Sequence, residues 1–274
     1  MIYRIYGATR LFLHIMAGIT LLVLTGALWN NKTALVKTTK CWWLGRATRL
    51  LGIRIQTHGE IPRSEPDRGV LYVSNHISWI DIPLIGSLTK LNFLSKAEVR
   101  DWPLIGKLAE GTGTLFIRRG SGDADRIAKS IAEYLDEGRN VLFFPEGTTS
   151  DGRSVRRFHS KLFKAVHHTD ISLCPVAIHY SINNSDHNPV AFIDDHEFSA
   201  HLWNLLKYRD ITAHVAFLPT RIVPNENVEA FVRAVRQEIS HSVQRLNKTT
   251  QLNTSTQWPD ASIHDDQKGE ATSF

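Results

Sequence analysis

The chain has 274 residues, of which 42% are apolar and 22% charged, so it can bury a sizeable core in one large or two small domains. Its formal charge of +5 is a mild basic excess, compatible with an anionic membrane surface, anionic substrates or nucleic acid. Only two cysteines occur, Cys41 and Cys174, which excludes a disulfide framework and fits a reducing cytosol.

The first long apolar segment runs from Leu11 to Trp29, contains no charged residue and is about as short as a bilayer-crossing helix can be. A cleaved signal peptide would have a shorter apolar region and a small-residue cleavage site, so we expect an uncleaved membrane anchor. Lysine and arginine are more frequent after this segment than before it. If the segment spans the membrane, the positive-inside rule places the rest of the chain in the cytoplasm.

The next segment, from Lys40 to Ile53, has an apolar stripe opposite a basic one at helical spacing. The apolar stripe consists of Trp43, Leu44, Ala47, Leu50 and Leu51. We expect an interfacial helix that lies on the membrane; an ordinary core-packed helix is the alternative. Together with the first helix it could form a hairpin that dips into one leaflet. Residues 1–56 are therefore assigned to membrane-anchoring and interfacial helices.

Strand-like and helical segments alternate through the rest of the chain. The strand-like runs are residues 69–75, 91–95, 114–119, 140–147, 172–180, 189–193 and 211–219. One helical stripe extends from Ala124 to Leu135, before Gly138, and a final amphipathic helix extends from Val228 to Leu246. This alternation predicts an α/β domain over residues 57–246, with a largely parallel or mixed sheet flanked by helices. Residues 247–274 are polar without periodicity, which predicts a disordered tail.

The sequence NHISWID (residues 75–81) lies where a buried strand gives way to a helix, the place where α/β sheets carry reactive groups. His76 suits a general base because histidine titrates near neutrality. A carboxylate such as Asp81 can orient the imidazole and stabilise the imidazolium. On one helix, residues five apart point about 140° apart. The pair therefore requires His76 in the loop and Asp81 in the first helical turn.

The same residues have a purely structural interpretation. Ser78 and Asp81 form a helix-capping signature, with Ser78 at the N-cap and Asp81 three residues later. Helix initiation alone could account for both residues, and His76 could stand beside them by chance.

Three further blocks follow in order: GTLFIRR (113–119), FPEGTTS (144–150) and CPV (174–176). With NHISWID, their order and spacing resemble the lysophosphatidate acyltransferase family, the 1-acylglycerol-3-phosphate O-acyltransferases and their relatives. The resemblance covers Gly69 to Ile178. It implies a membrane enzyme of phospholipid biosynthesis that transfers a fatty acyl group to the free hydroxyl of 1-acylglycerol-3-phosphate and forms phosphatidic acid. Acyl-CoA or acyl carrier protein would supply the thioester.

The resemblance also implies a role for particular residues. His76 would be the catalytic base and Asp81 its partner. Lys96 and Arg119 would bind the acceptor phosphate, which suits the two parallel donors of a guanidinium. Arg118 stands where the family commonly has an acidic residue, so the register favours Arg119.

The remaining site residues belong to the pocket around the acceptor. Glu146, Gly147 and Thr148 are expected to bind its glycerol part. The residues expected to shape the pocket are Asn75, Ser78, Pro145 and Pro175.

We expect no metal and no resident cofactor, because the thirteen histidines lack ligand spacing such as His-Glu-x-x-His. The expected partners are membrane lipids, a lysophospholipid acceptor and the acyl donor, without nucleic acid. We expect the chain at a bacterial inner membrane, with its catalytic domain facing the cytoplasm.

Other functions explain less of the sequence. Lysophosphatidate is the expected acceptor, because Lys96 and Arg119 together suit a phosphate monoester. Lyso-ornithine lipid, whose carboxylate could meet the same cations, is the alternative. A hydrolase would need a nucleophile, and no Gly-x-Ser-x-Gly elbow occurs. A non-enzymatic membrane-surface adaptor would leave the spaced His, Asp, Glu and Arg blocks unexplained.

Overall fold

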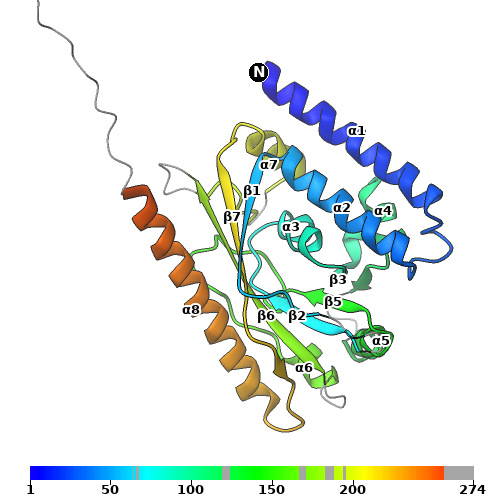
Figure 1. Ribbon diagram of the computed structural model, residues 1–274, viewed down its shortest axis with the longest axis vertical. Helices are drawn as coiled ribbons and strands as arrows, with labels where there is room; N and C mark the ends of the chain where they lie inside the picture. Colours follow the sequence, from blue (N-terminus) through cyan, green and yellow to red (C-terminus); the bar gives the residue numbers. More distant parts are fainter. Residues whose placement is uncertain are drawn as a thin grey trace, which may run out of the picture.

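An eight-stranded sheet organises the chain (Figure 1). The structure, a computed structural model, describes residues 1–63, 65, 68–118, 124–166, 171–182, 188–193 and 196–255. The strands lie in the order β1-β7-β6-β2-β5-β3-β4, with β8 paired to β6. Among the described strands, β6 pairs antiparallel with β7 and β8, and the other pairs are parallel. The predicted α/β class with a largely parallel, mixed sheet is confirmed.

The strand bounds match most of the predicted strand-like runs. They are β1 (Ile53–His58), β2 (Val70–Ser74), β3 (Leu91–Lys96), β4 (Leu115–Ile117), β5 (Asn140–Phe143), β6 (Ser172–Ile182), β7 (Ile211–Phe217) and β8 (Arg221–Ile222).

The structure corrects two predictions about residues near the sheet. The boundary expected between residues 56 and 57 falls inside β1, which pairs with β7 and so belongs to the sheet. Residues 189–193 form a turn and irregular chain, held to the site loop by a hydrogen bond from Phe192 N–H to Ile77 O.

Helices cover both faces of the sheet. They are α1 (Ile2–Leu24), α2 (Ala34–Leu50), α3 (Asp81–Leu88), α4 (Ile105–Gly111), α5 (Ala124–Asp136), α6 (Lys161–Val166), α7 (Phe198–Leu205) and α8 (Val228–Ser255), with a 3₁₀ helix at Ala97–Asp101. One core cluster joins α5, α6 and α8 to the sheet, and another joins α2, α3 and α7 to its opposite face. Burial of these apolar faces, which contributes about 25 cal/mol per Å², holds the layers together.

The last helix is longer than its apolar stripe predicts. Val228 to Leu246 pack on the sheet as expected, but α8 continues to Ser255. The disordered tail expected from residue 247 is therefore wrong for residues 247–255. A helix can extend past its last core residue because each added residue completes a backbone hydrogen bond. The remainder of the predicted tail, residues 256–274, lies outside the described residues.

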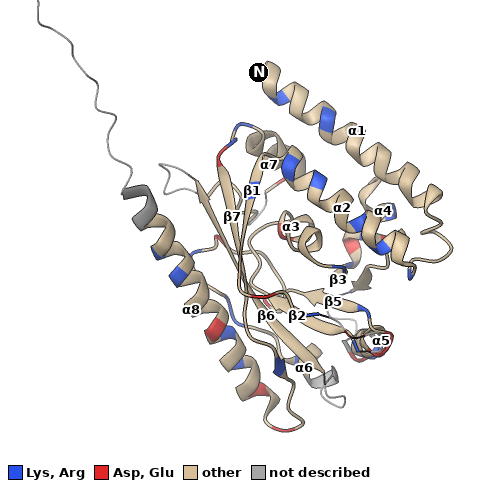
Figure 2. Cartoon of the chain, in the orientation of Figure 1, with Lys and Arg blue, Asp and Glu red and all other residues tan. Residues whose placement is uncertain are grey.

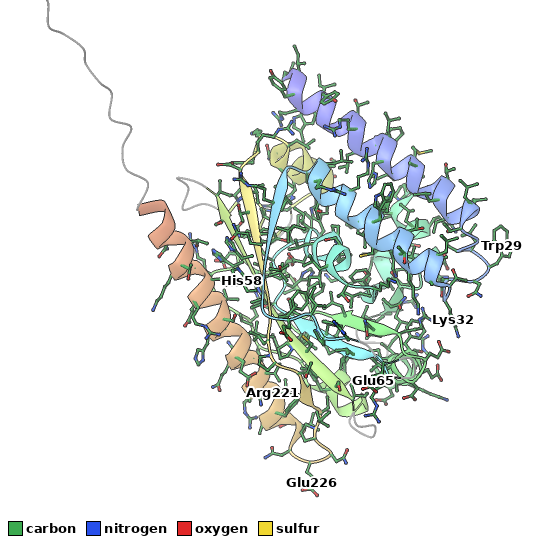
Figure 3. All side chains as sticks on the ribbon, viewed as in Figure 1. Trp29, Lys32, His58, Glu65, Arg221 and Glu226 are labelled. Carbon is green, nitrogen blue, oxygen red and sulfur yellow. The ribbon has the colours of Figure 1, made fainter. Side chains whose placement is uncertain are left out.

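Helix α1 presents a mostly apolar surface away from the rest of the protein. It is long and apolar enough to cross a membrane by length and composition, and in Figure 2 its charged positions are confined to its N-terminal half. The exposed large apolar residues on and after it are Met1, Ile2, Tyr3, Ile5, Tyr6, Phe12, Leu13, Met16, Val23, Leu24, Leu28 and Trp29. Trp29 points outward in Figure 3. Such a surface supports membrane association.

Helix α2 does not use its apolar stripe on the membrane, so that prediction is wrong. Leu44, Ala47 and Leu50 are buried inside the protein, and α2 packs against α3 and α1. Trp43 stacks on His14 of α1, with 4.6 Å between ring centroids. An amphipathic pattern shows that one face avoids water but does not distinguish a protein neighbour from lipid. On α2, Leu35 and Trp42 are the exposed apolar residues beside α1.

Two neighbouring histidines should make stability depend on pH. His179 and His214 lie opposite each other on β6 and β7, and burial lowers the pKa of each from 6.5 to about 4. Below about pH 6.5 these two histidines bind protons in the unfolded chain, whereas in the folded chain they bind protons only near pH 4. Stability should therefore fall as the pH decreases from 6.5 to 4, by at most about 3 kcal/mol for each histidine.

Chemical denaturation of detergent-solubilised protein between pH 7 and pH 4.5 measures this effect. In the variants His179→Gln and His214→Gln, the free energy of unfolding should change less with pH than it does in the wild type. Parallel curves for wild type and variants would contradict the assignment.

Candidate functional site

The predicted site residues that the structure describes lie at one edge of the sheet, because parallel strands place their carboxyl ends together. His76 follows β2, the loop 144–150 follows β5, and Lys96 ends β3. Arg118 follows β4, whose Ile117 pairs with Lys96. Residues more than 40 positions apart in the chain therefore share one surface.

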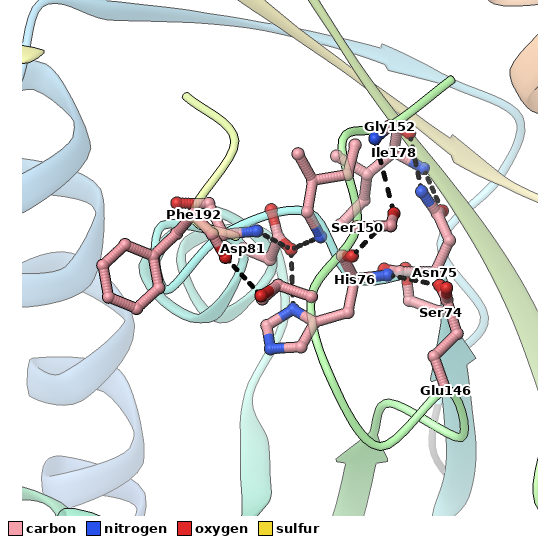
Figure 4. A network of polar contacts seen from close by, with 12 residues as sticks. Ser74, Asn75, His76, Asp81, Glu146, Ser150, Gly152, Ile178 and Phe192 are labelled. Carbon is pink, nitrogen blue, oxygen red and sulfur yellow. Dashed lines mark hydrogen bonds and ion pairs between the residues drawn. The ribbon is translucent and has the colours of Figure 1, made fainter. Parts of the chain in front are cut away.

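The central contact of this edge joins His76 to Asp81. His76 Nδ1 lies 2.8 Å from Asp81 Oδ2 (Figure 4). The Asp81 side chain is fully buried, whereas the His76 side chain is 17% exposed. The imidazole also stacks on Phe144, with 3.9 Å between ring centroids. Since no hydrogen bond joins Nε2 to any described residue, that nitrogen is the one available to a substrate.

The geometry is the one that the five-residue spacing requires. His76 lies in the loop after β2, and Asp81 is the first residue of α3. Asp81 Oδ2 also accepts hydrogen bonds from the backbone N–H groups of Ile77 and Ser78, at 2.7 and 2.9 Å. The carboxylate thus accepts from two backbone donors of the loop that leads into α3 while it holds the imidazole.

The capping interpretation is therefore realised only in part. Asp81 serves the helix start, but the helix begins after Ile80, and no side chain caps it there. Ser78 Oγ is buried without a hydrogen-bond partner among the described residues. Ser78 is thus not the N-cap, and Asp81 has a second contact, with His76, that capping does not require.

The loop after β5 fixes the main chain of His76. Glu146 Oε1 accepts a hydrogen bond from His76 N–H at 2.8 Å, and the Ser150 N–H donates to His76 O, also at 2.8 Å. Both polar backbone groups of His76 are therefore paired with one loop (Figure 4). This bracing limits the positions that the imidazole can occupy.

Glu146 occupies a structural position in that loop. Its side chain is 3% exposed, and its second oxygen accepts from Arg156 N–H at 2.8 Å. Burial raises the pKa of the Glu146 carboxyl to about 7. Both oxygens accept from backbone N–H groups, of His76 and of Arg156, so Glu146 holds the main chain around His76. Its expected contact with the acceptor stays a prediction. Gly147 makes the turn possible, since its φ of +70° suits glycine.

The other pocket residues brace the same edge. The Asn75 side chain pairs with both backbone groups of Ile178, donating at 3.0 Å and accepting at 2.8 Å. Pro145 O accepts from His159 N–H. Pro175 lies within β6 opposite Val73, and Thr148 is half-buried in the loop. Asn75 thereby clamps the site loop to β6.

The cationic residues are only partly described. Lys96 and Arg118 are exposed at the ends of neighbouring strands β3 and β4. Arg119, the expected phosphate ligand, lies outside the described residues. The proposed preference for Arg119 over Arg118 stays a prediction.

Sequence reasoning missed Tyr180, whose hydroxyl donates to Asp81 Oδ1 at 2.7 Å. Tyr180 lies on β6, about 100 residues from its partner in the chain. A phenol within a mostly apolar strand was the available signal. The hydrogen bond from this phenol to Asp81 depends on the pairing of β6 with β2, which could not be predicted from the sequence.

An apolar cavity of about 130 Å³ lies between α1, α2 and α4. Ile82, the neighbour of Asp81 in α3, lines it together with Leu22, Trp43 and Leu108. Lys40 also lines it and donates to Thr112 O at 3.0 Å, while burial lowers the Lys40 pKa to about 7. At this volume the cavity can hold a group about the size of benzene, or a short part of an apolar chain.

Comparisons with known proteins agree on one family. The family model described as Acyltransferase matches residues 53–179. A lyso-ornithine lipid O-acyltransferase of Pseudomonas aeruginosa is 41% identical over 227 residues, covering 82% of this chain and 84% of that protein. A 1-acyl-sn-glycerol-3-phosphate acyltransferase of Neisseria meningitidis serogroup B is 30% identical over 183 residues, covering 64% and 72%.

The crystal structure of the 1-acyl-sn-glycerophosphate acyltransferase of Thermotoga maritima has a similar fold. It matches with a TM-score of 0.68 and 18% identity, covering 94% of this chain and 97% of that one. At this identity the likeness establishes the fold alone.

The buried Glu146 carboxyl should also affect stability. The pKa of this carboxyl is about 7 in the folded chain and 4.5 when it is exposed to water. As the pH rises, the carboxyl therefore ionises at a lower pH in the unfolded chain than in the folded one. The contribution of the Glu146 carboxyl to the free energy of unfolding is fully present below pH 4.5. It is lost as the pH rises toward 7, a decrease of at most about 3 kcal/mol. Glu146→Gln should therefore gain stability relative to wild type over this range.

Glu137 provides a control of opposite sign. Its hydrogen bond with Lys32 lowers the Glu137 pKa, so that its stabilisation is present at high pH and is lost as the pH falls. Glu137→Gln should lose stability relative to wild type as the pH rises. Urea unfolding of both variants and the wild type at several pH values measures these changes. If the unfolding free energy of both variants changed with pH as it does in the wild type, the prediction would be wrong.

Proposed function

Because the chain belongs to the lysophosphatidate-type glycerolipid acyltransferase family, we propose that His76 is the general base that transfers a fatty acyl group from a thioester to a lyso-lipid hydroxyl. The contact of His76 Nδ1 with the buried Asp81 carboxylate supports this role best, because it leaves Nε2 directed to substrate. A carboxylate in this position stabilises the imidazolium that forms.

The reaction then follows from the roles of these two residues. His76 Nε2 takes the proton of the acceptor hydroxyl while its oxygen attacks the thioester carbonyl carbon. The tetrahedral intermediate collapses as the C–S bond breaks, and the imidazolium returns the proton to the leaving thiolate. The N–H groups of Ile77 and Ser78 are bound to Asp81, so the donors to the oxyanion come from another part of the site. The step uses no metal and no resident cofactor.

The acyl donor supplies the apolar substrate. We propose that its fatty chain enters the cavity between α1, α2 and α4, whose lining is largely apolar and includes Ile82 next to Asp81. Acyl-CoA and acyl carrier protein present the same thioester, so the chemistry is the same for both donors.

Lyso-ornithine lipid is the better supported acceptor. The relative that carries this name is more similar to the chain, and over more of it, than the relative that acylates 1-acyl-sn-glycerol-3-phosphate. The sequence motifs alone favour lysophosphatidate, and relatives of both kinds match the chain. Lysophosphatidate remains the second candidate, since Lys96 and Arg118 bring positive charge to the edge of the sheet that carries His76.

Helix α1 is proposed to lie along the membrane rather than across it. It contacts the rest of the protein over its whole length: Arg4 bonds Trp203 O of α7, His14 bonds Trp43 of α2, and Leu22 lies beside Gly111 of α4. A transverse α1 would draw α2, α4 and α7 into the bilayer with it. The exposed side of α1 would instead enter one leaflet, on the cytoplasmic face.

The general-base role predicts a large loss of activity in His76→Ala. Because a positioned base contributes about 10²- to 10⁴-fold, kcat with acyl-CoA and lyso-lipid should fall by at least a hundredfold. His241→Ala, the same change at an exposed histidine of α8, should retain wild-type activity. Near wild-type turnover by folded His76→Ala would refute the mechanism.

Acceptor choice is tested with purified wild-type protein, one acyl donor and two acceptors. We expect a higher kcat/KM for lyso-ornithine lipid than for lysophosphatidate, measured by the formation of the diacylated product. The reverse order would make lysophosphatidate the physiological type of acceptor. Repeating both assays with acyl-CoA and acyl carrier protein would also identify the donor.

A further inference from the structure

The two oxygens of Asp81 have different partners. Oδ2 accepts from His76 and from the N–H groups of Ile77 and Ser78. Oδ1 accepts from Tyr180, at 2.7 Å. Asp81 is fully buried and Tyr180 is 4% exposed, so water does not replace this phenol easily. A buried carboxylate oxygen without a donor would be costly.

Tyr180 is held opposite Asp81 by the sheet. β6 runs parallel to β2 in the register Ser74 with Val176. Just past the end of that pairing, the Asn75 side chain bonds both backbone groups of Ile178. Tyr180 is two residues farther along β6 and has its side chain on the same face as Ile178. The strand therefore contacts the site loop twice, through a backbone clamp and through the phenol.

We propose that Tyr180 is a positioning residue for acyl transfer, whose hydroxyl fixes the Asp81 carboxylate and disperses part of its charge. This inference rests on the proposed function of His76. Tyr180 acts through Asp81, since its hydroxyl bonds Asp81 and no hydrogen bond or ring contact joins it to His76 in the described part of the chain. Burial and then the charge of Asp81 raise the pKa of Tyr180 well above 10, which keeps the phenol a donor throughout the working pH range.

The hydroxyl has two separate effects on His76. With Oδ1 anchored, the carboxylate cannot turn about its Cβ–Cγ bond, so Oδ2 stays directed at Nδ1. Because the phenol donates to the carboxylate, Oδ2 attracts the imidazolium less strongly than an unshared carboxylate would. Without the phenol, the ring should be less well oriented and should take up its proton at a higher pH.

The experiment compares Tyr180→Phe with Tyr72→Phe. Tyr72 is a matched control, because it is also a buried tyrosine in the same sheet and its hydroxyl donates to Pro62 O, away from the site. Tyr180→Phe should lower kcat about tenfold or more, as expected for a hydrogen bond to a charged group. KM for donor and acceptor should change little, and the acidic limb of the pH–rate profile should move to higher pH. Tyr72→Phe should leave all three unchanged.

A second measurement does not depend on turnover. The protonation of the His76 ring is followed by NMR in detergent, with His76→Gln to assign its signal. We expect the ring of Tyr180→Phe to protonate at a higher pH than that of wild type and of Tyr72→Phe.

The outcomes separate this inference from the proposed function. An unshifted ring titration, or equal loss of kcat in both tyrosine variants without a shift of the acidic limb, would reduce Tyr180 to a core residue and overturn the inference. An active His76→Ala would instead overturn the proposed function, and the NMR titration would still decide whether Tyr180 controls Asp81.

Discussion

The buried carboxylate of Asp81 is the constraint on which the rest of the site depends. A carboxylate without water is tolerated only when its oxygens are paired, and Asp81 has three donors besides the imidazole. Two of these donors come from its own loop and one from β6. The same hydrogen bonds that offset the cost of burying this carboxylate also fix the loop before α3 and direct Oδ2 at His76. One buried carboxylate thus holds both the loop before α3 and the imidazole of His76.

The sheet supplies the second level of order. Parallel β2, β5, β3 and β4 bring His76, the Glu146 loop, Lys96 and Arg118 to one edge. Within this edge, most polar side chains near His76 contact backbone rather than open space. Glu146, Ser150 and Asn75 all hold main-chain groups. The site therefore consists of a partly exposed imidazole supported by a braced loop, which limits the positions that His76 can take.

The N-terminal helices pack beside this edge of the sheet. α1 is exposed on one side and packs against α2, α4 and α7 on the other. Trp43 of α2 turns inward, stacking on His14 and lining the apolar cavity. If the acyl chain enters this cavity, as we propose, the packing of α1 on α2 and α4 would serve both membrane association and access to His76.

The sequence by itself determined the parts that depend on local pattern. It gave the α/β class, most strands, and the requirement that His76 precede the helix bearing Asp81, because these follow from periodicity and from helical geometry. Tertiary structure decided what depends on neighbours. The stripe of α2 meets protein instead of lipid, Glu146 points at backbone, and Tyr180 reaches Asp81, because each contact depends on packing or strand register between segments far apart in the chain.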